Sequence, residues 1–331
     1  MTSKIRWSLP EGVDELLPPK ALQVEKLRRR LLDLYLSHGY EFIIPPLLEL
    51  SETLGGEAHE ELQEYAFSFK DDLTGQNISI RPDMSEQASR IDAYRMESDS
   101  IVKLCYVGDV VKRKVSKVLR SRTTIQAGAE IFGDSSLESD KESINLMLES
   151  LKTLGIKDIT LSLGHAGIAS AVLNQFQELN KTEILELEMA VSKKSISDIE
   201  VILHNERDKE KVKAITELCG LYGDRKILET ASKSLAYLGQ EVQACLDYMK
   251  ELLNSLEKNN DYKLHVDLGE VLGFKYHNGI VFSSYTDTAG YSLAKGGRYD
   301  GLRKLDDVPR PAVGFDLDLL AAANFTNLDL I

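Results

Sequence analysis

Residues 18–50 read PPKALQVEKLRRRLLDLYLSHGYEFIIPPLLEL and combine two periodicities. In the first part, apolar residues recur at helical spacing on one stripe, with two prolines at the start and Gly39 at the end. The second part, 40–50, is an apolar extended run that Pro45–Pro46 interrupts, because proline cannot donate to a sheet ladder. The segment therefore predicts an amphipathic helix over 18–39 that leads into a strand. The stripe consists of Val24, Leu27, Leu31 and Leu34.

Further runs of strand character follow, and turn residues separate several of them. They lie at 77–81 (NISIR), 103–113 (KLCYVGDVVKR), 125–133 (IQAGAEIFG), 158–164 (DITLSLG), 263–269 (KLHVDLG) and 279–286 (GIVFSSYT). We expect them to be neighbours in one mainly antiparallel sheet. The stretch 312–323, AVGFDLDLLAAA, predicts a last strand that enters a helix.

A long segment without sheet signals separates these strands into two groups. From Ile168 to Cys219 there is neither glycine nor proline, and helical spacing with interleaved Glu and Lys continues to about residue 258. We therefore expect an α+β fold, a mainly antiparallel sheet flanked by helices, with a helical insertion. The expected division is a first core segment at 1–170, the insertion at 171–259 and a second core segment at 260–331.

Composition narrows the classes of function. The 331 residues are 43% hydrophobic and 28% charged, as in ordinary globular proteins, and no run approaches the ~20 apolar residues of a membrane span. No signal peptide is visible, so we expect a cytoplasmic protein without membrane association. The net charge of −13 disfavours binding to a polyanion such as tRNA. The dispersed Cys105, Cys219 and Cys245 indicate neither disulfides nor a zinc site, and we expect no metal and no cofactor.

Two polar segments are candidates for binding. Asp83, in RPDMS, could accept a hydrogen bond from a ligand's ammonium group or could cap the helix that follows. Six cations, four of them outside the strands, could hold phosphate or an acidic partner surface, or could form a solvated loop. They are Lys112, Arg113, Lys114, Lys117, Arg120 and Arg122.

Two further patterns concern the strands themselves. Gln126 and Glu130 are four residues apart on a strand, so they share a face, where they could contact an imidazole or amine ligand, bond each other or face water. The run GGRYD, 296–300, predicts a tight glycine turn, and Arg298 with Asp300 could be a structural pair. The pair His265 and Asp267 is not sufficient for a metal site.

Taken in order, these segments resemble class II aminoacyl-tRNA synthetases, specifically the histidyl-tRNA synthetase branch, over most of 8–170 and 261–323. GYEFIIPPLLEL resembles the dimer-forming motif 1. RPDMSEQASR, YVGDVVKRK and RSRTTIQAGAEIFG resemble the segment through motif 2, and AVGFDLDLLAAA resembles motif 3. LGFKYHNGIVF and GGRYDGL resemble the two histidine-specific motifs.

The departures from that pattern concern the chemistry of ATP. Where the synthetases carry a motif 2 arginine and a nearby acid, this chain has Lys112 and Lys114, and lysine cannot reproduce a guanidinium fork. Ala321 replaces the motif 3 arginine, and Leu272 and Lys275 replace charged residues of the first histidine motif. We expect negligible adenylate formation, because loss of one such contact lowers a rate by about 10²–10³. We also expect no anticodon-binding domain.

This combination resembles the regulatory subunits of short-form ATP phosphoribosyltransferase, whose start is similar to WSLPEGVDELLPP. The resemblance implies a non-catalytic subunit that activates the catalytic subunit, conveys inhibition by histidine and forms a homodimer within a hetero-oligomer, expected to be a hetero-octamer. It implies histidine binding by Asp83, Arg122, Gln126, Glu130 and Tyr276, with Lys112, Arg113, Lys114, Lys117 and Arg120 left for anion or partner contacts. The alternatives are a histidyl-tRNA synthetase fragment or another synthetase-like binding protein.

Overall fold

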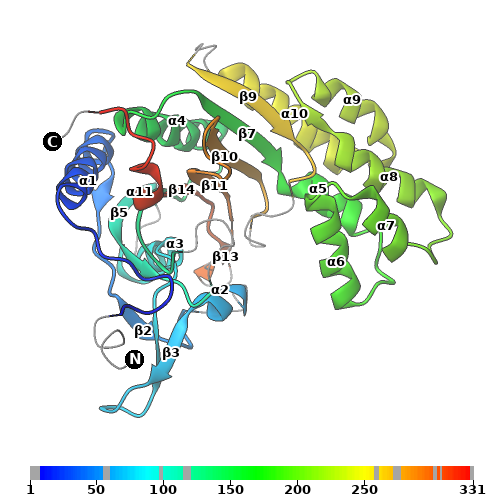
Figure 1. The fold of residues 1–331 in the computed structure, drawn as a ribbon. Helices are drawn as coiled ribbons and strands as arrows, with labels where there is room; N and C mark the ends of the chain where they lie inside the picture. The colour runs from blue at the N-terminus through cyan, green and yellow to red at the C-terminus, as the bar shows by residue number, and fades with distance from the viewer. Residues whose placement is uncertain are drawn as a thin grey trace.

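A large sheet forms the centre of the molecule (Figure 1). The computed structural model describes residues 8–54, 60–96, 100–114, 121–256, 261–270, 277–300, 304–305 and 308–328. Within these ranges the sheet has nine strands, antiparallel except for the β1/β5 and β7/β9 pairs. Their order is β1 (Glu41–Phe42), β5 (Val102–Val111), β6 (Thr123–Phe132), β14 (Ala312–Asp318), β11 (Ala294–Arg298), β10 (Ile280–Thr286), β7 (Ile159–His165), β9 (Tyr262–Asp267) and β8 (Tyr222–Gly223).

A second, three-stranded sheet lies apart from the first. It has the order β2 (Leu48–Leu50), β4 (Asn77–Ile80) and β3 (Phe67–Lys70), beside α2 (Glu60–Tyr65) in Figure 1. The expectation that 77–81 joins the main sheet was therefore wrong, because β2 and β3 pair with β4 on both of its sides. Pro45 and Pro46 separate β1 from β2, so the run 40–50 contributes to both sheets. A short hairpin pairs β12 (Lys304–Leu305) with β13 (Val308–Pro309).

One face of the main sheet packs against two long helices, α1 (Lys20–Ser37) and α4 (Leu137–Thr153). The predicted stripe on α1 buries Val24, Leu27 and Leu31, which confirms the amphipathic helix. Alternate residues of β14 meet these helices, and Phe315 contacts the Tyr35 ring edge to face at 6.1 Å. The core therefore lies between this face and the helices, and α11 (Leu319–Ala322) follows β14 as predicted.

Helices fill the sequence between β7 and β9. They are α5 (Ala166–Leu173), α6 (Lys181–Ser192), α7 (Ile196–Ile202), α8 (Lys209–Gly220), α9 (Ile227–Ser234) and α10 (Gln240–Ser255). Asn180 begins α6 with a capping box, and Asp208 caps α8. Figure 1 shows these helices beside the β9 edge of the sheet. No helix in the described residues is long and apolar enough to span a membrane.

The glycines of GGRYD lie in a strand, so the predicted glycine turn was wrong. Gly296 and Gly297 belong to β11 and pair with β10 and β14 on its two sides. A Cβ on Gly296 would lie 2.2 Å from the Gly314 carbonyl oxygen, and one on Gly297 would lie 2.6 Å from Cδ2 of His277. These glycines therefore allow neighbouring groups to approach closely.

Candidate functional site

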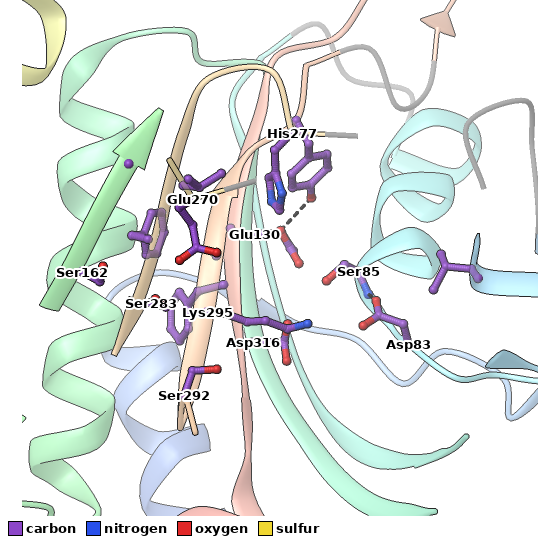
Figure 2. A pocket seen from close by; sticks show the side chains of 18 of the residues that line it. Asp83, Ser85, Glu130, Ser162, Glu270, His277, Ser283, Ser292, Lys295 and Asp316 are labelled. Carbon is purple, nitrogen blue, oxygen red and sulfur yellow. Dashed lines mark hydrogen bonds between the residues drawn. The ribbon is translucent and has the colours of Figure 1, made fainter. Parts of the chain in front are cut away.

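A cavity of about 500 Å³ opens on the sheet face opposite α1 and α4 (Figure 2). Strands β6, β14, β11, β10 and β7 supply its floor, and the start of α3 (Ser85–Ile91) faces them. Four carboxyl groups line it, and three lysines lie among or beside them. These residues are Asp83, Glu130, Glu270 and Asp316, with Lys112, Lys114 and Lys295. The size is that of a small-molecule pocket.

A row of small residues crosses the floor of the cavity. Strand register places Gly164, Val281, Gly297, Gly314 and Glu130 side by side on five successive strands. A Cβ on Gly314 would lie 1.6 Å from Oε2 of Glu130, so the carboxyl group lies directly across that glycine. The His277 ring lies over Gly297 in the same way, and Glu270 lies next to Gly164. The glycines thus make room for three polar side chains above the sheet.

Glu130 is the most deeply buried carboxyl group of the cavity. Its side chain is 1% exposed, and it accepts hydrogen bonds from the hydroxyls of Tyr106 (3.0 Å, to Oε1) and Tyr299 (2.6 Å, to Oε2). Burial raises the pKa of Glu130 to about 8, against the lowering effect of Tyr299, Ser85 and Tyr106. A buried carboxyl with two phenol donors is prepared to accept a further N–H group from a ligand.

Asp83 is held in place by Gln126, which lies on the same face of β6 as Glu130. Gln126 donates from Nε2 to Oδ2 of Asp83 (2.7 Å) and accepts from the Met84 backbone N–H (2.8 Å). The other oxygen, Oδ1, accepts from the backbone N–H of Ser85 (2.8 Å). Asp83 therefore bonds the start of α3, as the capping interpretation predicted, and it also lines the cavity, where its contact with a ligand stays a prediction. Gln126 bonds Asp83 rather than Glu130, and the lining of the cavity in the described residues does not include it.

Some of the cations of 112–122 line the cavity, and others do not. Lys112 and Lys114 line the cavity, and Lys114 pairs with Glu64 and lies over the Tyr65 ring. The Arg113 backbone N–H donates to the Tyr65 carbonyl (2.7 Å). Arg122 lies over the Phe67 ring, 5.8 Å from its centroid, and is not among the described residues that line the cavity. Tyr276, Lys117 and Arg120 lie outside the described residues, as do Leu272 and Lys275.

Arg298 faces away from the cavity and forms a structural network. It is 7% exposed and donates to Oδ1 of Asp140 on α4 from Nε (2.9 Å) and Nη2 (2.6 Å), and from Nη1 to Asp300 (3.1 Å). Tyr248 of α10 donates to the second oxygen of Asp140 at 2.5 Å. The prediction that Arg298 and Asp300 form a structural pair is therefore confirmed, and Asp140 belongs to the same network.

Several cavity residues were not singled out from the sequence. Glu270, Lys295, Tyr299 and Asp316 line it, and the buried Tyr106 bonds Glu130. A signal did exist in AVGFDLD, where Gly314 and Asp316 alternate with Val313, Phe315 and Leu317, as on a strand with one apolar and one polar face. For Glu270 there was none, because its position depends on a turn after β9.

Known proteins match the chain over nearly its full length. The histidyl-tRNA synthetase family model matches residues 12–322. An ATP phosphoribosyltransferase regulatory subunit of Thioalkalivibrio sulfidiphilus is 37% identical, over 96% of this chain and 81% of that protein. A structure of an ATP phosphoribosyltransferase regulatory subunit/histidyl-tRNA synthetase from Bacillus halodurans has a TM-score of 0.84 at 25% identity and covers 99% of this chain and 85% of that one.

A chain of the ATP phosphoribosyl transferase (HisG:HisZ) complex from Thermotoga maritima shares the fold, with a TM-score of 0.64 at 19% identity over 92% of this chain and 98% of that one. These matches confirm the α+β, class II synthetase-like fold expected from the ordered motifs. The chain belongs to the family of ATP phosphoribosyltransferase regulatory subunits, non-catalytic subunits of an enzyme of histidine biosynthesis.

Proposed function

We propose that this regulatory subunit binds free histidine in the cavity and thereby conveys feedback inhibition. The observation that carries the proposal is Glu130, a buried carboxyl group held by two phenols and directed into a cavity that also contains Asp83. Glu130 accepts a hydrogen bond from the imidazole N–H, and Asp83 pairs with the α-ammonium group. Tyr276 and Arg122 remain predictions as histidine contacts, and Gln126 acts by holding Asp83.

The partner in this proposal is the catalytic subunit of short-form ATP phosphoribosyltransferase, in the cytoplasm. The Thermotoga maritima complex, whose chain shares this fold, supports such an assembly. A homodimer of the regulatory subunit within a hetero-octamer is the arrangement that the family resemblance implies. Histidine then regulates by binding one arrangement of the complex more tightly than another, with a coupling of typically ~1–3 kcal/mol.

The test is a comparison of the wild-type complex with a Glu130→Ala complex. The two subunits are co-purified, and ATP phosphoribosyltransferase activity is titrated with histidine. We expect the variant to assemble and to activate the catalytic subunit normally but to lose inhibition by histidine. Unchanged inhibition of the Glu130→Ala complex would remove Glu130 from the histidine site.

We further propose that the chain neither activates histidine nor binds tRNA. Ala321 lies in α11 as a buried methyl group whose N–H donates to Asp318, and Lys114 is engaged by Glu64. Neither residue offers the guanidinium fork that grips a triphosphate. Histidine-dependent exchange of pyrophosphate with ATP measures this directly, and we expect a rate no higher than without protein. Exchange at an enzyme-like rate would favour the synthetase alternative.

A further inference from the structure

Histidine carries three polar groups, and the proposed function accounts for two of them. The imidazole meets Glu130 and the ammonium group meets Asp83, but the α-carboxylate would enter a cavity with four carboxyl groups in its walls. Transfer of an anion from water into such surroundings is unfavourable unless a cation accompanies it. The described lining offers three cations for this purpose: Lys112, Lys114 and Lys295.

Two of these lysines lie toward one end of the site. Lys114 is half exposed, pairs with Glu64 and lies over Tyr65. Lys112 follows the end of β5, and its backbone N–H donates to the Arg122 carbonyl (2.8 Å). Arg122 immediately precedes β6, and along that strand Gln126 comes before Glu130. Lys112 is therefore separated from Glu130 by the Asp83–Gln126 pair.

Lys295 occupies the middle of the floor. Strand register aligns Ser162, Ser283, Lys295, Asp316 and Gly128 in one row across five strands. Gly128 lies midway between Gln126, which holds Asp83, and Glu130 on β6, and Lys295 is two strands away from it in the same row. Figure 2 shows the Lys295 side chain extending past Asp316 toward the side of the cavity where Asp83 and Ser85 lie.

We propose that the Lys295 ammonium group binds the α-carboxylate of the amino-acid effector. The assignment rests on the proposed histidine site and completes it: Asp83, Glu130 and Lys295 then form a triangle around the ligand, with one group for each of its polar parts. The site recognises a free zwitterionic amino acid and discriminates against imidazole compounds that lack the carboxylate.

Asp316 lies opposite Lys295 and balances its charge. The two residues are paired on β11 and β14. Burial raises the pKa of Asp316 and the Lys295 charge lowers it, more than the Lys112 charge does, with a net upward shift. The ammonium group has three donors, so it can keep Asp316 and also donate to an incoming carboxylate. With its raised pKa, Asp316 can take up a proton when that second carboxylate arrives.

The experiment compares two ligands that differ at one group. Calorimetric titration of the full chain measures binding of histidine and of histidinol, in which a hydroxymethyl group replaces the carboxylate. We expect the wild type to prefer histidine by about 10- to 100-fold, the range of one hydrogen bond to a charged group. Lys295→Met should lose this preference by weakening histidine alone, and Lys295→Arg should keep most of it because the charge remains.

Two further variants make the result decisive. Lys295→Met leaves the Asp316 carboxylate without a cation, which could itself repel histidine. The double variant Lys295→Met/Asp316→Asn removes that carboxylate, and we expect the preference for histidine over histidinol to be lost there too. Lys114→Met is the matched control, since it removes a cavity lysine that Glu64 already engages. A preference retained in both Lys295→Met variants, or lost in Lys114→Met alone, would overturn the assignment to Lys295. If the wild type binds neither ligand, the proposed histidine site fails and this assignment fails with it.

Discussion

The side chains on the two faces of strand β11 have different surroundings. Lys295, Gly297 and the following Tyr299 face the cavity, where their neighbours are carboxyl groups and an imidazole ring. Ala294 and Arg298 face the other way, toward the hydrophobic core and Asp140 of α4. Side chains on a strand alternate between faces, so adjacent residues of one pentapeptide, GGRYD, take part in different tasks.

The difference shows why the two faces respond differently to substitution. On the core face, every polar atom of Arg298 has a partner and the side chain is nearly inaccessible, so its interactions stabilise the fold. On the cavity face, Glu130 is kept buried beside an open space, with a pKa that burial raises. A buried carboxyl group with a raised pKa beside a cavity is a candidate for ligand binding, and we propose that role for Glu130.

The largest expected difference between the two faces is in the free energy of unfolding. Arg298→Met should lower the free energy of unfolding by about 3–5 kcal/mol, because it leaves Asp140 fully buried without its cation. Urea unfolding measures the loss. Lys263→Met is the matched control, since Lys263 also pairs with an aspartate but both side chains are more than half exposed, and it should leave the urea midpoint almost unchanged. Equal losses of stability in the two variants would contradict a stabilising role of Arg298.

The next effect concerns binding through the cavity face. Glu130→Gln keeps the shape of the side chain but cannot ionise, and above pH 8, where Glu130 is ionised, it should weaken histidine binding by about 1.5–3 kcal/mol. Calorimetric titration measures the affinity, and circular dichroism of the same sample shows whether the fold persists. Because Gly314 leaves space only for this side chain, glutamine is the substitution that fits. Wild-type affinity in the Glu130→Gln chain would place the ligand elsewhere.

The third effect is a dependence of stability on pH to which Glu130 should contribute. In the unfolded chain Glu130 ionises above its ordinary pKa of 4.5, whereas the folded chain keeps it protonated up to about pH 8. The folded state then binds more protons, so stability falls as pH rises between these values, by at most about 1.4 kcal/mol per pH unit. Glu130→Gln should reduce this slope. The check is the urea midpoint of both chains at pH 6, 7 and 8, and parallel curves would argue against a buried, protonated Glu130.

The sequence was sufficient for the elements whose apolar pattern is strong. The stripe of α1, the strands β5 and β6 and the strand-to-helix passage after β14 were all predicted, because a buried face repeats at a fixed period. The separate sheet of β2, β3 and β4 was not predicted. Strand character fixes how a segment is extended, whereas its partner depends on tertiary packing. The division at residues 170 and 260 remains a prediction.

The site was predicted in part for a related reason. Asp83 and Glu130 could be identified because they stand in motifs, and the structure places both in the cavity wall. The GGRYD run was misjudged because glycine pairs usually mark turns, whereas these glycines permit close contact across three adjacent strands. Lys295 and Asp316 are far apart in sequence, and only strand register brings them opposite each other.

The smallest expected effect comes from a single hydroxyl group that acts on both the ionisation of Glu130 and the binding of histidine. Tyr299→Phe removes the donor to Oε2 of Glu130, and that interaction is the largest of those that lower the pKa of this carboxyl. The variant should therefore raise the pKa of Glu130 and weaken histidine binding at pH 8 by about 0.5–1.5 kcal/mol, because less of the carboxyl is ionised to accept the imidazole N–H. The deficit should shrink at pH 9.5, where a larger fraction of Glu130 is ionised in both chains. Titration calorimetry at the two pH values measures it. A deficit of the same size at both would mean that Tyr299 contacts the ligand directly instead of acting through Glu130.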